Sequence, residues 1–354
     1  MPDLIVPRPQ GLWCEAGRFF IDPWRPVERA LITHAHGDHA RVGSNRYLAA
    51  REGEHVLRAR LGDIALETLA WGESIDVDGV RVSFHPAGHV LGAAQIRLEH
   101  DGETWVVSGD YRLEADRSCT AFAPLRCDVF VTESTFALPI YRWKPQREVM
   151  DEMLRWWSEN AEASRASVLF CYALGKAQRI LAGLADAAGA SLPGVIVCHG
   201  AVEAMNRAYR ASGIALPDTL VVDAVDRASL RRALVLAPPS AARSPWLRRF
   251  GAAGDAFASG WMQVRGTRRR RAIDRGFVLS DHADWPGLNA AIDATGAARV
   301  VATHGYADVL VRWLRERGLE AGRFATEYGD DVEDDGEDEG GKKEPASRDP
   351  ELAP

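Results

Sequence analysis

Residues 31–40 read LITHAHGDHA, and this segment decides how the whole chain is interpreted. Its first residues are apolar and predict a buried strand that ends in a polar loop. The loop offers four side chains that can bind metal: His34, His36, Asp38 and His39. Alternate residues of an extended chain point to the same side, so one short loop can serve two metal ions. Imidazole and carboxylate ligands suit zinc or manganese, and mixed shells of this kind are typical of hydrolytic sites.

Other predicted strands also end on polar residues. The strands expected at 19–22, 80–85, 104–110, 128–134 and 299–305 all finish near a histidine, an aspartate or a glutamate. These strand ends contribute Asp22, His89, Asp110, Glu133 and His304. A rigid sheet can hold such loops together at one edge while its core stays apolar. The sequence therefore predicts one polar site built from several strand ends.

The pattern changes in the middle of the chain. An apolar helical face at 146–161 is followed by strands expected at 168–172, 194–200, 220–223 and 232–239, with helices between them. This alternation predicts βαβ units around a parallel sheet. We therefore expect residues 141–274 to form a unit inserted into a domain made of residues 1–140 and 275–328.

Composition limits the class of protein. Of the 354 residues 46% are hydrophobic, which excludes a disordered or fibrous chain. The net charge of −7 comes from residues 330–354, which hold eleven acidic and three basic side chains. We expect residues 329–354 to be a disordered acidic tail. The five cysteines form no C-x-x-C pair, so we expect reduced core thiols. Without a long apolar run or a leader pattern, the chain is expected to be cytoplasmic and not bound to a membrane.

Four short motifs together resemble the metallo-β-lactamase superfamily: IDP at 21–23, THAHGDHA at 33–40, AGHVLG at 87–92 and SGD at 108–110. The resemblance implies an α/β fold of the αββα sandwich type that binds two divalent ions. It also implies the ligands. The first metal would bind His34, His36 and His89, and the second Asp38, His39 and His304. Asp110 would bridge both metals, and Asp22 would orient the ligand loop, a support that metal sites usually need.

About 200 residues separate Asp110 from His304, whereas small-molecule members of that superfamily run directly between these motifs. The interval, together with Glu133 in VTEST and His282 in LSDHAD, resembles the β-CASP nucleases, whose cap would be the inserted unit. TESTFALPIYRW, YALGKAQR, HGAVE, SGWM and VLSDHADW are most similar to bacterial exonucleases described as DNA-ligase-associated. The resemblance implies a DNA exonuclease that prefers single strands and digests 5′ to 3′. It would work in DNA repair with an ATP-dependent DNA ligase and a helicase.

Phosphodiester hydrolysis needs cations on the phosphate, an activated water and a proton for the leaving oxygen. Two divalent ions, with Zn²⁺ preferred and Mn²⁺ as the alternative, would meet the first two needs, and Asp38 counts among the catalytic residues as their ligand. For the proton we select His282 as general acid, with Glu133 holding its tautomer and raising its pKa. Asp281 and Asp284 are alternatives to Glu133 as that partner.

Basic residues are candidates for holding nucleic acid. Lys176 and Arg179 lie at the start of the helix expected after Gly175, where a phosphate could bind. The run RGTRRRRAIDR at 265–275 contains six arginines, among them Arg268, Arg269, Arg270 and Arg271. His199 is a weaker phosphate candidate. Residues 259–261, including Trp261, could shape the cleft.

Three other functions stay open on the sequence alone. A histidine at 304 is typical of RNA-acting β-CASP members, which makes an RNA-processing endo- or exoribonuclease the main alternative. A non-catalytic β-CASP scaffold is disfavoured because all seven ligand positions are intact. A small-ester hydrolase is disfavoured by the inserted unit and by the arginine run.

Overall fold

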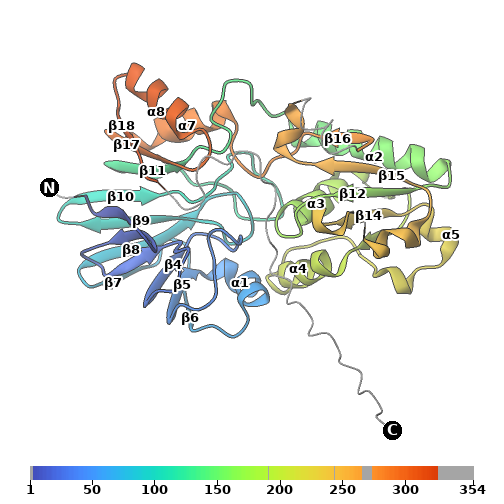
Figure 1. Cartoon of the computed structure of the whole chain (residues 1–354), viewed down its shortest axis with the longest axis horizontal. Coiled ribbons are helices and arrows are strands. Elements are labelled where there is room, and N and C mark those ends of the chain that lie inside the picture. The colour runs from blue at the N-terminus through green and yellow to red at the C-terminus, as the bar shows by residue number, and fades with distance from the viewer. Residues whose placement is uncertain (1–2, 190, 243, 265–272, 326–354) are drawn as a thin grey trace, which may run out of the picture.

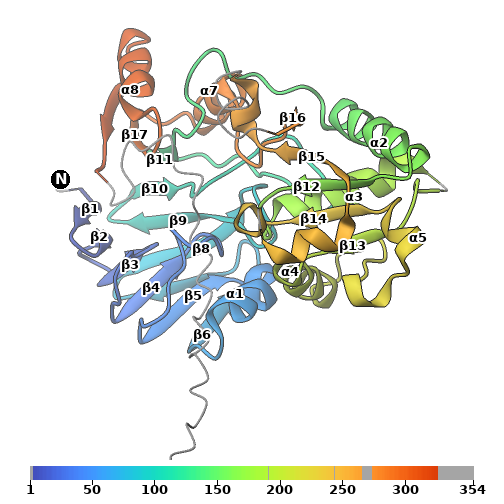
Figure 2. The same cartoon turned by 45° about the vertical axis from the view of Figure 1, so that its right-hand side comes forward.

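The computed structural model describes residues 3–189, 191–242, 244–264 and 273–325 of the chain. Its strands form three sheets joined by helices, which confirms the predicted α/β class. Two sheets lie face to face at one end of the molecule, and the third lies at the other end among helices (Figures 1 and 2). Residues 265–272, which hold most of the arginine run, and the acidic tail lie outside the described residues.

The first sheet is built from the N-terminal part of the chain. It contains six strands in sequence order: β1 (Ile5–Arg8), β2 (Gly11–Cys14), β3 (Phe19–Ile21), β4 (Arg29–Ile32), β5 (Arg46–Ala50) and β6 (Leu66–Leu69). β4 pairs in parallel with β3 and β5, so the segment that carries His34 leaves the middle of this sheet. A short turn η1 (Arg51–Gly53) leads into helix α1 (Glu54–Leu61).

The second sheet combines residues from both ends of the chain. Its strands, in spatial order, are β18 (Glu320–Arg323), β17 (Arg299–Thr303), β11 (Val129–Glu133), β10 (Glu103–Val107), β9 (Ala94–His100), β8 (Val80–Pro86) and β7 (Ser74–Val77). β11 and β17 run parallel with Glu133 opposite Thr303. This register places Glu133 and His304 at the same edge of the sheet.

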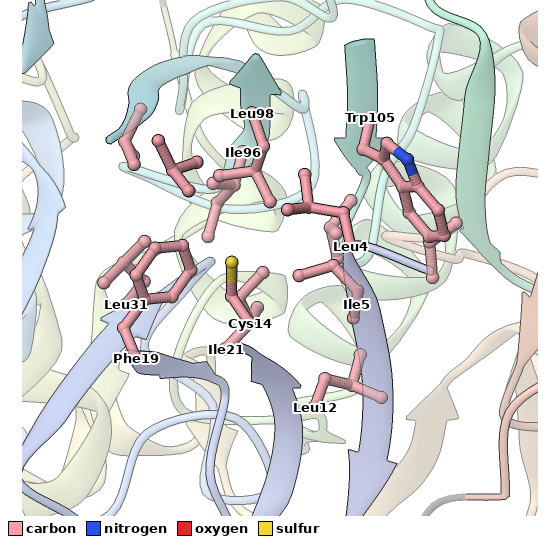
Figure 3. Packing of buried hydrophobic residues seen from close by; sticks show 14 of the residues in the cluster. Leu4, Ile5, Leu12, Cys14, Phe19, Ile21, Leu31, Ile96, Leu98 and Trp105 are labelled. Atoms are coloured by element: carbon pink, nitrogen blue, oxygen red, sulfur yellow. The ribbon is translucent and has the colours of Figure 1, made fainter. Parts of the chain in front are cut away.

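Apolar side chains fill the space between the two sheets. Phe19 and Leu31 of the first sheet belong to one buried cluster with Ile96, Leu98 and Trp105 of the second (Figure 3). Helix α1 packs on the outer face of the first sheet. Helices α7 (Trp285–Thr295) and α8 (Ala307–Glu316) pack on the outer face of the second. The layers are therefore helix, sheet, sheet and helix, as the sandwich expectation requires.

The third sheet is parallel throughout, in the order β13 (Ile196–Cys198), β14 (Leu234–Ala237), β12 (Ala166–Phe170), β15 (Ala253–Ala258) and β16 (Arg275–Phe277). Its helices are α2 (Gln146–Glu162), α3 (Lys176–Ala188), α4 (Gly200–Ala211) and α5 (Arg227–Leu230), with the short turns η2 (Val222–Ala224), η3 (Pro239–Ala241), η4 (Pro245–Phe250) and η5 (Gly260–Gln263). The core against α2 and α3 lies on one face, and a second apolar cluster with residues of η4 and η5 lies on the other.

Two details of this unit differ from the sequence-based expectation. Residues 220–223 form an isolated bridge at Leu220 and then the turn η2, not a strand. β16 pairs with β15, so the third sheet extends to Phe277 and the chain returns to the second sheet after that residue, not at 275. Both follow from pairing across the sheet, which local apolar runs do not specify.

The cysteine and membrane expectations concern the chain as a whole. All five cysteines are free and buried: Cys14, Cys119, Cys127, Cys171 and Cys198. This confirms that they are core residues. In the part of the chain that the structure describes, no helix has both the length and the apolar character needed to cross a membrane.

Candidate metal centre and active site

The predicted ligands come together beyond the carboxyl ends of β4, β8, β10 and β17. Among the described residues, three groups of possible ligand atoms, each within 4.8 Å of one another, share the carboxylate of Asp110; two consist of predicted ligands, and the third adds Glu133 and His282. The first group contains His34, His36, His89 and Asp110, and the second contains His39, Asp110 and His304. Asp38 is not part of these groups but lies beside the second one, with its Oδ2 3.4 Å from His39 Nε2. All seven predicted ligands thus occupy one site, with Asp110 between the two groups.

Nitrogen atoms in the first group lie at the separations expected for ligands of one ion. His36 Nδ1 is 3.1 Å from both His34 Nε2 and His89 Nε2. Two ligands bound at about 2.0–2.1 Å in tetrahedral geometry would be separated by roughly 3.3 Å. The Oδ2 atom of Asp110 lies 3.5 Å from His34 Nε2 and 3.7 Å from His89 Nε2, at the same corner of the site.

The outer nitrogens of two histidines in the first group show which ring nitrogen faces the centre. His36 Nε2 lies 3.3 Å from the carbonyl oxygen of Leu174, and His89 Nδ1 lies 2.9 Å from that of Asp281. A carbonyl only accepts, so each of these nitrogens carries the hydrogen. The inner nitrogens, His36 Nδ1 and His89 Nε2, then present lone pairs to each other. A cation between them removes this repulsion, which is the usual arrangement of a metal-bound imidazole.

Asp22 performs the same task for the second group. Its Oδ2 accepts a hydrogen bond from His39 Nδ1 at 2.7 Å, and its Oδ1 accepts one from the backbone N–H of Thr33 at 2.7 Å. Asp22 and His304 both adopt a left-handed backbone, with φ of 44° and 48°. Such conformations in residues other than glycine cluster at functional sites, where the surroundings hold them in place.

Close packing explains why the SGD motif has a glycine at position 109. Gly109 has φ of +56°, and a Cβ atom there would lie 2.7 Å from Thr33 Cβ. The chain before Asp110 can therefore approach the ligand loop only without a side chain at position 109. Thr33 was not selected from the sequence, although its backbone and hydroxyl groups both donate to Asp22.

The electrostatics of the site require added positive charge. Asp38 Oδ1 and Asp110 Oδ1 are buried without a hydrogen-bond partner in the described part of the chain. Burial disfavours a charged His39, but the carboxylates of Asp38, Asp110 and Asp22 outweigh it and hold the pKa of His39 well above its ordinary value. Two divalent cations would satisfy the orphaned oxygens and replace that proton. The donor set of imidazoles and carboxylates therefore fits the ions that the sequence predicts.

Glu133 and His282 form the predicted pair beside the metal ligands. His282 Nδ1 lies 2.9 Å from Glu133 Oε2, and Glu133 Oε1 accepts a hydrogen bond from the backbone N–H of Tyr111 at 2.8 Å. The structure selects Glu133 over the two alternatives, because Asp281 pairs with Lys176 and Asp284 caps helix α7.

The surroundings of His282 favour its protonated form. Burial lowers the pKa of the ring, but the carboxylates of Glu133 and Asp110 outweigh it and raise this pKa to about 9. Nδ1 holds the hydrogen shared with Glu133, so Nε2 is the atom left to hold a proton for transfer.

Lys176 and Arg179 are placed differently from the sequence-based expectation. Only 3% of Lys176 and 1% of Arg179 is exposed, so neither guanidinium nor ammonium group faces a phosphate in solution. Lys176 Nζ lies 3.0 Å from Asp281 Oδ2, and Arg179 Nε lies 2.7 Å from Asp116 Oδ2. The N-terminus of α3 is also closed, because the side chain of Gln178 accepts from the backbone N–H of Gly175. The predicted phosphate contact therefore has no support, and these two residues serve as internal cations.

These cations hold the segment that delivers His282. The carbonyl oxygen of Leu279 accepts from Lys176 Nζ at 3.3 Å. That of Ser280 accepts from Arg179 Nη1 at 3.1 Å and from Arg112 Nη1 at 2.8 Å. We call residues 279–282 the clamped segment. Arg112 follows Asp110 by two residues, but nothing in the sequence marks it as part of this clamp.

Of the remaining candidates, His199 caps its own helix by accepting from the backbone N–H of Ala201, and its ring lies 5.0 Å from that of Trp246. It takes no part in the metal groups. The hydroxyl of Ser259 accepts from the backbone N–H of Trp261. Arg268, Arg269, Arg270 and Arg271 lie outside the described residues.

Comparisons with known proteins identify relatives of this chain. A protein of Opitutus terrae described as a probable DNA ligase is 32% identical over 315 residues, which is 88% of this chain and 30% of that protein. Cleavage and polyadenylation specificity factor 73 of Drosophila melanogaster is 33% identical over 118 residues, or 33% of this chain and 17% of that protein. Endoribonuclease YSH1 of Saccharomyces cerevisiae is 31% identical over 118 residues, or 33% of this chain and 15% of that protein.

Over a shared stretch of 118 residues, about a third of this chain, it is homologous to cleavage and polyadenylation specificity factor 73 and to YSH1, which are β-CASP metallo-β-lactamase nucleases. This confirms the resemblance that the motifs predict, although the chain spans less than a third of the length of each of these relatives. No family model matches the chain. A crystal structure of a protein of unknown function from Enterococcus faecalis V583 superimposes with a TM-score of 0.54 at 14% identity, covering 85% of this chain and 80% of that one. That similarity concerns the fold alone.

Proposed function

We propose that this chain is a metal-dependent nuclease that hydrolyses phosphodiester bonds, and that the third-sheet unit is its β-CASP cap. One observation carries the proposal: two groups of metal ligands share Asp110 and lie directly beside the His282–Glu133 pair. A site that can hold two cations and a proton donor together matches the needs of phosphodiester hydrolysis.

The two ion positions would be held by the groups described above, with zinc favoured by the histidine content and manganese as the alternative. When bound, two such ions neutralise charge on the scissile phosphate and make a water molecule nucleophilic near neutral pH. The protein's own part is to fix the ligands. Asp22 orients His39, and the carbonyls of Leu174 and Asp281 orient His36 and His89.

His282 supplies the proton in this proposal. Glu133 holds Nδ1 of the ring, so Nε2 donates its proton to the oxygen that leaves the phosphorus atom. The raised pKa keeps the ring protonated at neutral pH, which is the state that a general acid needs. Because Glu133 also accepts from the backbone N–H of Tyr111, it is held at both oxygens and cannot turn away.

DNA is the substrate that we propose, with exonucleolytic, 5′ to 3′ digestion of single strands. Support comes from the relative described as a probable DNA ligase, which matches 88% of this chain. The same similarity leads us to propose a DNA ligase as a partner in repair, with a helicase in the same pathway. RNA is the second candidate, because two of the relatives are named for RNA processing and position 304 is a histidine.

The deciding experiment uses purified protein loaded with zinc or manganese and matched single-stranded DNA and RNA oligonucleotides labelled at either end. We expect stepwise release of mononucleotides from DNA only, starting at the 5′ end. Preferred cleavage of RNA, or cleavage at internal bonds, would instead support the RNA-processing function. The Asp110→Ala protein, prepared in parallel, identifies any contaminating nuclease, since it should cleave neither substrate.

A further inference from the structure

We propose that a cluster of aromatic side chains next to His282 stacks against an unpaired nucleobase of the substrate. The proposal rests on the proposed nuclease function and names the part of the substrate that the site would recognise. We call this set of rings the aromatic platform: Phe136, Tyr141, Trp143, Trp261 and Tyr306.

The platform is assembled from separate parts of the fold. The ring of Phe136 lies 4.5 Å from Trp261, 4.9 Å from Trp143 and 4.8 Å from Tyr141, measured between centroids. Tyr141 lies 6.2 Å from Tyr306. Three of the rings come from the segment between β11 and α2, which arches from one half of the molecule to the other (Figures 1 and 2). Trp261 belongs to η5 of the third-sheet unit, so the platform spans both halves.

Its position relative to the chemistry is fixed by short contacts. The ring of Phe136 is 5.9 Å from that of His282, and Trp143 Nε1 donates to the carbonyl oxygen of His282 at 2.9 Å. Phe136 follows Glu133 by three residues, and Tyr306 follows His304 by two. A nucleobase is joined to its phosphate through a single sugar. A phosphate held at the metal groups would therefore place a neighbouring base within reach of these rings.

The platform has a rigid base and a partly exposed surface. Phe136 and Tyr141 are each 2% exposed, whereas Trp143, Trp261 and Tyr306 are partly exposed. Gly260 permits the close approach of Phe136, since a Cβ atom there would lie 2.6 Å from the ring. The backbone N–H of Trp143 donates to Asp284 at 2.9 Å, which holds the backbone of this residue at the start of helix α7. Rings held in this way lose little freedom when a ligand stacks on them.

The chemistry favours a base over other ligands. Aromatic rings stack on the π face that every nucleobase has, so such sites accept single strands without strong sequence preference. In a duplex the same faces are covered by neighbouring base pairs. The platform therefore predicts that this site recognises unpaired nucleotides, and that the base beside the scissile phosphate contributes to the rate.

The first test compares a normal single-stranded oligonucleotide with one that carries abasic residues on both sides of the scissile phosphate. We expect the wild-type protein to cleave the abasic substrate with a kcat/KM that is roughly 10- to 100-fold lower. The Trp261→Ala variant should show a similar loss on the normal substrate and little further loss on the abasic one. Trp313→Ala is the matched control, because Trp313 is an exposed tryptophan of α8 that contacts Trp285 outside the platform.

Equal cleavage of both substrates by the wild-type protein would overturn the stacking proposal and leave the nuclease function intact. It would also be overturned if the loss in kcat/KM caused by Trp261→Ala and the loss caused by removing the bases were fully additive. If no oligonucleotide is cleaved, a measurement of oligonucleotide binding tests the stacking proposal instead. Quenching of tryptophan fluorescence by the normal oligonucleotide, reduced for the abasic one and in Trp261→Ala, would support the platform, and equal quenching would reject it.

Discussion

The ligand loop at residues 33–39 and the clamped segment at 279–282 deliver different parts of the active site by different means. The loop takes its shape from nearby elements: it follows β4 directly, and its main outer support, Asp22, is only 17 residues from His39. The clamped segment depends on partners 101 to 192 residues away along the chain, namely Lys176, Arg179, Arg112 and His89. The loop is thus positioned mainly by nearby residues, with Leu174 as a distant support of His36, whereas the proton donor is positioned by contacts across the fold.

This difference has an energetic side. Lys176, Arg179 and Asp281 are buried, so their charges have lost most of their hydration and depend on one another. In the ligand loop, in contrast, the metal ions themselves would neutralise the buried carboxylates. Removing an ion pair from the clamped segment should therefore cost folding stability, while removing a ligand from the loop should cost metal binding.

The largest expected effect comes from breaking the group that both metal positions share. Asp110→Ala should lower the nuclease rate by about 10,000-fold or more, because neither ion position would then be complete. Metal content measured by mass spectrometry should fall in the same variant. Asp63→Ala, an exposed aspartate, is the control. Retention of metal and activity by Asp110→Ala would contradict the shared role of this carboxylate.

His282→Ala tests the clamped segment on its own. The rate should fall by roughly 100- to 10,000-fold, the range for loss of a general acid, while metal content stays at the wild-type level. Glu133→Gln should produce a smaller loss of the same kind, since it keeps the shape and removes the charge that raises the pKa of His282. A His282→Ala protein with wild-type activity would remove the proposed proton donor.

Lys176→Met tests whether distant charge holds the segment. Removing one partner of a buried ion pair typically costs about 3–5 kcal/mol, and we expect the lower end because Arg179 still faces Asp281. Denaturant unfolding would measure this loss. Arg147→Met removes an exposed pair with Asp151 and should cost less than about 1 kcal/mol. Similar values for the two variants would show that the clamp is not a stabilising element.

Asp22→Asn gives the smallest expected effect and sharpens the account of the loop. The amide keeps an oxygen for the N–H of Thr33 but weakens the hold on His39 Nδ1. Metal affinity in a competition titration should fall by about 10- to 100-fold, the usual cost of losing such a support. Unfolding stability of the metal-free protein should change little. An unaltered affinity would mean that the loop holds its ligands without Asp22.

Much of the site could be predicted because its residues lie at strand ends with strong local patterns. His34, His36, Asp38 and His39 share one loop, and His89, Asp110 and His304 each follow an apolar strand. The burial of Lys176 and Arg179 against acidic side chains was not predicted, because a positive charge near a helix start looks the same in the sequence whether it meets solvent or a buried acid. Residues 265–272, which hold five of the six arginines of the run, lie outside the described residues, so the role of the run stays a prediction.

By itself the sequence determined the strand-end chemistry, since alternating side chains in an extended segment and ligand types suited to divalent ions are local properties. It also determined the mixed α/β character, because short apolar strands in the first part of the chain give way to alternating helices and strands in the middle. Only the tertiary structure decided which acid meets His282, which cations hold its segment, and which aromatic rings gather beside it. Those choices depend on contacts between residues more than 100 positions apart, and no local pattern encodes the distance between two such side chains.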